Sequence, residues 1–166
     1  MKKALLLSIF ICSFIRVATA QTAWIDYKVD EKISVKLPVQ PKTIQGNVYA
    51  TDKDSSMYII AIIDFLKVAG VDSVAMAPME PTPQFGDQLK TGMLSQMPGY
   101  TLGDVKIDKW HGHYTYTVEG SNAGKKLKTY VYMICWGNTM YSLMVIAPEK
   151  NPIKGKDDFF ASVKAT

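Results

Sequence analysis

Apolar and polar residues alternate along much of the chain after residue 24, and this pattern predicts β-strands. In the first two runs, 25–29 and 33–37, every second residue is apolar, and Asp30-Glu31 lies between the runs as a turn. Pro38 ends the second run, since proline cannot continue a central strand. We therefore expect a hairpin with one face toward water at the start of the mature chain.

Two later segments are apolar at both odd and even positions. The first is 57–66 (MYIIAIIDFL), and the second is the pair 130–136 and 139–146, which are joined by Gly137-Asn138. A two-residue connection that begins with glycine favours a type II′ hairpin. Strands that are apolar on both faces are typical of strands covered on both sides, so we expect these three at the centre of a sheet.

Two segments have the features of helices. Thr82 is a good N-cap for a helix over 82–97, with proline at the first helical position and Pro98-Gly99 after it. Its apolar stripe recurs every four residues: Phe85, Leu89, Met93 and Met97. A second, closing helix is expected from about Lys156, with Asp157 and Asp158 at its positive end and Lys164 at its negative end.

Further alternating runs at 46–51, 105–110 and 114–120 bring the expected strand number to six or seven. Most neighbouring strands are joined by connections too short for a parallel crossover, which favours a mainly antiparallel sheet. With helices at two separate places, the expected fold is α+β, a three-layer α/β/α sandwich. Residues 21–166 hold no internal repeat or linker, and we expect one domain there.

Residues 1–20 have the three parts of a secretory signal peptide. Lys2 and Lys3 form a positive start, an apolar run follows, and Ala18-Thr19-Ala20 is a cleavage motif. The run is shorter than the roughly 20 residues that a membrane-spanning helix needs, and no later run is long enough either. We expect cleavage between Ala20 and Gln21 and a periplasmic or extracellular protein with no transmembrane span in its mature form.

The charge balance argues against a nucleic-acid binder. The chain has 19 Lys and Arg against 15 Asp and Glu, a net charge of +4. Removal of the signal peptide would leave 16 basic and 15 acidic residues and would take away Arg16, the only arginine. Phosphate and guanine recognition depend on clustered arginine and lysine, so nucleic acid is not an expected partner.

The order of the expected elements resembles that of the PsbP-like proteins, a family named for an extrinsic protein of photosystem II. The residues that carry the resemblance are Ile33–Pro38, Tyr114–Tyr116, Met140–Leu143 and Phe159-Phe160. The family includes photosystem subunits, a nuclear-import factor that binds a small GTPase, and exported bacterial proteins of unknown role. The resemblance implies the fold and assigns no function to any residue.

The only two histidines lie in a short aromatic segment, and they define the candidate surface site: Trp110, His111, His113 and Tyr114. Two imidazoles two residues apart on a strand share a face and could supply two metal ligands. Asp104 and Asp108 are the nearby candidates for a third. Alternatively, His111-Gly112 is a hairpin turn that points the two rings in different directions. Because two ligands do not make a zinc site, we expect no metal and no cofactor.

Three other polar or reactive groups are expected to be structural. Cys135 alternates with apolar residues, so we expect it to be buried and inert rather than a nucleophile. Asp64, in an apolar strand, needs a partner or exposure to water. The loop 52–56 lacks the glycine and glutamate of an EF-hand.

No catalytic motif or catalytic residue stands out in the chain. The favoured function is therefore that of an exported, non-catalytic binding or envelope-associated module that acts on a protein, a glycan or an envelope component. The alternative is a small metal-dependent or hydrolytic enzyme that uses the Trp110–His113 region.

Overall fold

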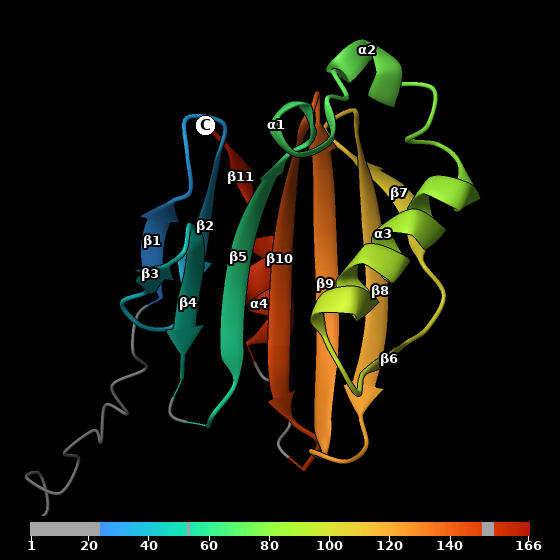
Figure 1. Cartoon of the computed structure of the whole chain (residues 1–166). Helices are drawn as coiled ribbons and strands as arrows, with labels where there is room; N and C mark the ends of the chain where they lie inside the picture. The colour runs from blue at the N-terminus through green and yellow to red at the C-terminus, as the bar shows by residue number, and fades with distance from the viewer. Residues whose placement is uncertain (1–23, 53, 151–154) are drawn as a thin grey trace, which may run out of the picture.

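The computed structural model describes residues 24–52, 54–150 and 155–166. Its centre is an eight-stranded sheet, one strand larger than the upper expectation (Figure 1). The strand order is β3 (Lys42–Ile44), β4 (Asn47–Thr51), β5 (Met57–Asp64), β10 (Thr139–Pro148), β9 (Leu127–Trp136), β8 (His113–Asn122) and β6 (Thr101–Leu102), and β7 (Lys106–Trp110) also pairs with β8. All pairings between the described strands are antiparallel, so the α+β class and the mainly antiparallel sheet are confirmed.

The hairpin expected over 25–37 belongs to a second, smaller sheet. It consists of β1 (Ile25–Lys28) and β2 (Ile33–Leu37), and β11 (Lys164–Ala165) adds to the far edge of β2. Together with α4 (Lys156–Ala161) this sheet covers one face of the large sheet, where Phe159 and Val163 join the core. A small sheet and one short helix therefore make up this covering layer.

The closing helix is shorter than we expected, and the position expected for Lys164 was wrong. The helix ends at Ala161, and the hydroxyl of Ser162 donates to the carbonyl of Phe159 (2.6 Å) while it accepts the backbone N–H of Lys36 (2.8 Å). The chain then extends and Lys164 pairs with β2. Asp157 and Asp158 do lie in the first turn of the helix, as expected.

Three helices follow β5 in the chain and precede β6. They are α1 (Phe65–Ala69), α2 (Ser73–Met76) and α3 (Pro83–Gln96). The hydroxyl of Thr82 accepts the N–H of Phe85, as expected of an N-cap, and proline occupies the first turn of α3. In Figure 1, α3 lies across β8 and β9, while α1 and α2 lie near one end of the sheet.

The central hairpin of β9 and β10 has the expected register and turn. Thr139 pairs with Trp136, and Gly137 has a φ of +65°, the positive value that a type II′ turn requires at its first central position. Side chains of β9 are buried on both faces: Ile134 faces the core under the small sheet, and Met133 faces the core under α3. The expectation of a doubly covered strand is confirmed for β9.

The same expectation was wrong for β5. The strand ends at Asp64, two residues earlier than expected, because this carboxylate caps α1 by accepting the N–H groups of Leu66 and Lys67. Tyr58 and Ile60 are buried under the small sheet, although Ile62 on the same face is 43% exposed. On the opposite face Ile63 is only partly buried, and Met57 is 37% exposed. The apolar second face of β5 therefore borders open space beside α3.

None of the described helices is both long and apolar enough to cross a bilayer. The signal peptide expected at residues 1–20 lies outside the described residues.

Candidate functional site

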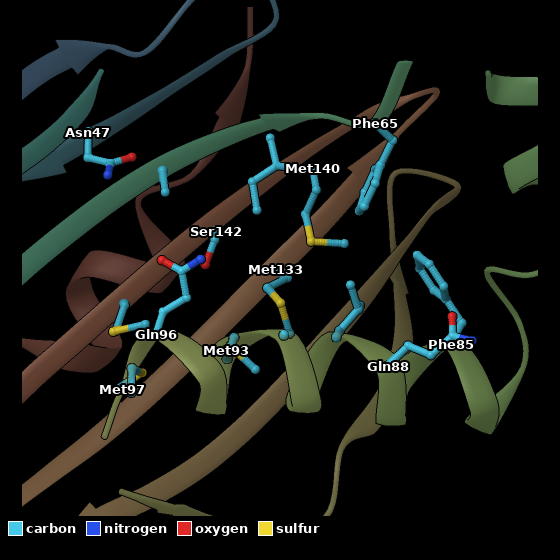
Figure 2. Close-up of a pocket in the computed structure, with 15 residues that line it drawn as sticks. Asn47, Phe65, Phe85, Gln88, Met93, Gln96, Met97, Met133, Met140 and Ser142 are labelled. Carbon is cyan, nitrogen blue, oxygen red and sulfur yellow. The ribbon is translucent and has the colours of Figure 1, made fainter. Parts of the chain in front are cut away.

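A half-open groove lies between α3 and the face of the large sheet formed by β5, β10 and β9 (Figure 2). Its volume is about 510 Å³. The groove exists because α3 lies over the β8 side of the sheet and leaves the β5 side without a helix above it. Ligand pockets in proteins usually have volumes of roughly 300–1,000 Å³, so the groove is large enough for a small organic molecule.

Apolar side chains dominate the lining, and methionines are the largest group. α3 and its C-cap contribute two of the five methionines and strands β9 and β10 contribute the rest: Met93, Met97, Met133, Met140 and Met144. The other apolar residues are Ala61, Ile63, Phe65, Phe85 and Leu89. Methionine is flexible and polarisable and can adjust to ligands of different outline, which suits a binding surface better than a catalytic one.

Three residues of α3, each one turn from the next, form the helical rim of the groove: Gln88, Gly92 and Gln96. Gly92 lies in the helix interior and has no positive φ, so the backbone does not require glycine there. Gly92 is exposed, and a Cβ atom there would meet no heavy atom within 4 Å apart from the adjoining residues and the backbone of its own helix. Glycine costs about 1 kcal/mol relative to alanine inside a helix, and neither backbone nor packing explains that cost at Gly92.

Gly86, on the same helix, has a packing reason to be glycine. It is buried, and a Cβ atom there would lie 3.2 Å from Cγ1 of Val105. The small size of Gly86 thus allows α3 to approach the segment that leads into β7. The two glycines of α3 differ in this respect, and only Gly92 borders the groove.

The polar residues of the lining are uncharged, and their side chains make no hydrogen bond with the described part of the chain. They are Asn47, Gln88, Gln96 and Ser142. Ser142 is buried in the middle of β10 and faces the groove, whereas Gln88 and Gln96 are exposed at its rim. No Asp, Glu, Lys, Arg, His or Cys is among these described lining residues, so the groove offers hydrogen bonds but no ionisable side chain that could act as a general acid or base beside Ser142.

The candidate surface site expected from the sequence is divided between the two faces of the sheet. His111 and Gly112 form a hairpin turn with φ values of +50° and +84°, and Trp110 pairs with His113 across it. Trp110 packs against the core under the small sheet, whereas Tyr114 faces the core under α3. The structure therefore separates Tyr114 from the other three residues.

Each histidine ring lies against a different tryptophan. His111 contacts the Trp110 ring edge-on, with centroids 4.5 Å apart, and His113 stacks on Trp136 at 4.2 Å. Burial, together with the positive charge of Lys32 and the proximity of His111, lowers the pKa of His113. Within the described ranges, no three His, Cys, Asp or Glu residues are grouped so that they could hold a metal ion.

The surroundings of Cys135 and Asp64 indicate that both residues have structural roles. Cys135 is buried, as expected, and burial raises the pKa of its thiol to about 12. Asp64 finds its partners at the N-terminus of α1 and accepts a further hydrogen bond of 2.8 Å from the side-chain amide of Asn138. Neither group lines the groove.

A second hollow, of about 440 Å³, lies on the opposite face near β8 and β9. Its lining includes Lys156, whose ammonium group lies 2.9 Å from the carboxylate of Asp157 and 4.8 Å from the centre of the Tyr130 ring. This cation already has partners within the chain, so the groove beside α3 is the stronger candidate for a binding site.

Comparison with known structures confirms the PsbP-like fold. The chain is similar to cyanobacterial PsbP from Synechocystis sp. PCC 6803, with a TM-score of 0.64 and 12% sequence identity over 90% of this chain and 96% of that one. A protein from Bacteroides thetaiotaomicron has a TM-score of 0.43 and 12% identity over 88% of this chain and 49% of its own length. No known family and no curated protein matches at the level of sequence. At such low identity the likeness establishes the fold alone.

Proposed function

We propose that this chain, which has the PsbP-like fold, is an exported, non-catalytic binding module that holds a small apolar molecule in the groove between α3 and the large sheet. The volume of the groove and its apolar lining support this function, since ligand sites are concave, mostly apolar and supplied with a few polar groups. The proposal extends the favoured interpretation of the sequence, because it assigns a surface to the binding activity.

Gly92 is the observation that carries the proposal. A helix in a stable domain gains from alanine or a larger residue at an interior position. Gly92 is exposed on the groove side of α3, and no neighbouring side chain or element prevents a larger residue there. Positions that violate a local preference without a compensating contact are typical of functional sites. An empty space beside Gly92 is what a ligand would need.

Export is supported by the signal-peptide pattern of residues 1–20. The intact mass of protein recovered from the producing cell tests this part of the proposal. We expect a chain that begins at Gln21, and a mass that retains residues 1–20 would contradict it.

Binding can be tested with N-phenylnaphthylamine, an uncharged dye that fluoresces when it enters an apolar site. We expect the mature protein to bind this dye saturably, with one dye per chain. Gly92→Leu places a branched apolar side chain in the groove and is expected to weaken binding at least tenfold. Thr91→Leu adds similar apolar bulk at an exposed position of the same helix that does not line the groove, and it serves as the matched control.

Two results would contradict the proposal. One is the absence of saturable dye binding to the folded wild-type protein. The other is an equal loss of binding in Gly92→Leu and Thr91→Leu, since that would mean that the dye does not occupy the groove. The alternative of a metal-dependent or hydrolytic enzyme has no comparable observation in its favour, because the described residues around His111 and His113 supply no third ligand.

A further inference from the structure

We infer that the groove selects an uncharged, single-chain amphiphile: an extended hydrocarbon chain that carries a hydroxyl, ester or amide group. This inference rests on the proposed function and deepens it, since it names the chemical class of the ligand. It follows from the charge, the hydrogen-bonding groups, the length and the volume of the groove.

Charge is excluded from the groove on both of its walls. On the helix wall, α3 carries Asp87 and Lys90, but neither lines the groove, and the neutral residues Gln88, Gly92 and Gln96 lie there instead. On the sheet wall, the lining residues of β5 and β10 are apolar except for Ser142. A carboxylate or ammonium group in this space would lose water without gaining a counter-charge, which is costly.

Hydrogen-bonding groups are nevertheless present along the groove. Gln88 and Gln96 are eight residues apart on α3, which corresponds to about 12 Å along the helix axis. Each amide both donates and accepts, and the hydroxyl of Ser142, which faces the groove, does the same. A pure hydrocarbon would cover Ser142 without giving its hydroxyl a partner, whereas a ligand with a hydroxyl, ester or amide group would satisfy it.

The length and volume of the groove indicate a single extended chain. The lining extends along α3 from Phe85 to Met97, which is about 18 Å at the rise of an α-helix. A helix of a partner protein, with a diameter of about 10–12 Å, would take up roughly 1,400–2,000 Å³ over this length, far more than the groove volume of about 510 Å³. One extended hydrocarbon chain is much thinner than a helix and fits this volume.

The test compares three probes with the same ten-carbon chain: decanoylglycerol, decanoate and decyltrimethylammonium. Each is titrated below its micelle concentration against the mature protein loaded with N-phenylnaphthylamine, and dye displacement reports its affinity. We expect decanoylglycerol to bind at least tenfold more tightly than either charged probe.

A charge variant provides a gain of function that loss of folding cannot imitate. Gln96→Lys puts an ammonium group at the rim of the groove and is expected to increase the affinity for decanoate about threefold relative to decanoylglycerol. Gln84→Lys is the matched control, because Gln84 is an exposed glutamine of the same helix outside the groove, and we expect no change in this ratio.

The outcomes separate the two claims. If the dye binds but decanoate or decyltrimethylammonium displaces it as well as decanoylglycerol does, the inference about charge is wrong and the proposed function stands. If Gln96→Lys and Gln84→Lys change the ratio equally, the selection does not come from the groove and the inference is also wrong. If neither the dye nor any decyl probe binds to the folded protein, the proposed function fails and the inference fails with it.

Discussion

Gly92→Ala is expected to make the protein more stable, and the size of the effect follows from the local structure. The substitution adds one methyl group in the interior of α3, where alanine is favoured over glycine by about 0.8–1 kcal/mol. No heavy atom within 4 Å of the new Cβ would oppose it. We therefore expect the free energy of unfolding to rise by about 0.5–1 kcal/mol.

Gly86→Ala is the matched control, since it makes the same chemical change in the same helix. Its new Cβ would lie 3.2 Å from Cγ1 and 3.4 Å from Cβ of Val105, closer than comfortable packing allows. Overpacking of this kind costs about 1–3 kcal/mol, which cancels or exceeds the gain in helix propensity. We expect Gly86→Ala to be neutral or destabilising.

Urea unfolding followed by tryptophan fluorescence measures both free energies, and thermal unfolding followed by circular dichroism provides a second measure. The expected gain for Gly92→Ala corresponds to a rise in Tm of about 1–4 °C for a domain of this size. A loss of stability in Gly92→Ala would mean that the space beside Gly92 is already filled. Equal gains in the two variants would refute the claim that they differ in packing.

Three further predictions concern groups outside the groove. Tyr141→Phe removes the hydrogen bond of 2.6 Å that the buried Tyr141 hydroxyl donates to Asp30, and it should cost about 1.5 kcal/mol by urea unfolding at neutral pH. Burial raises the pKa of Asp30, but hydrogen bonds from Tyr141 and two backbone N–H groups outweigh burial and lower this pKa below 3.8. The stabilisation is therefore present above pH 3.8 and is lost as the pH falls through the pKa of folded Asp30. An equally steep loss of stability in acid for Tyr141→Phe would count against this Tyr141–Asp30 pair. Because burial raises the pKa of Cys135 to about 12, its thiol should react with a water-soluble thiol reagent far more slowly in the native protein than in denaturant, and equal rates would contradict this. Cys135→Ser should lower the free energy of unfolding by roughly 1–3 kcal/mol. Zinc and copper should show no stoichiometric micromolar binding by calorimetry, and tight binding that His113→Ala abolishes would reverse this expectation.

Elements with a local chemical signal were predictable from the sequence. The N-cap Thr82 and the following proline marked the start of α3 to the residue, and Gly137 marked the turn between β9 and β10. In both cases the physical cause, a capped N–H group or a positive φ, lies within a few residues of the signal. The hairpin of β1 and β2 was predictable for the same reason.

Features that depend on distant partners were not predictable. Lys164 was expected in a helix, but it pairs with Ser34 of β2, a residue 130 positions earlier in the sequence. Asp64 was recognised as a residue that needs a partner, yet the apolar residues after it obscured the change from strand to helix. The histidines near Trp110 suggested a metal site or an enzyme, because imidazoles are common ligands and bases, whereas the structure packs the rings of Trp110 and His113 each against Trp136.

The groove itself was missed because apolar residues on both faces of β5 predict that both faces are covered. Whether a helix covers that strand depends on where the helix lies on the sheet, and this position is set by contacts at its other side. Gly86 lets α3 approach Val105 and Ile107, which draws the helix toward the β7 edge and away from β5. Gly92 then leaves the uncovered side empty. The two glycines of α3 thus have different effects. Gly86 allows the helix to pack close to Val105, and Gly92 adds no side chain to the groove on the other side of the helix.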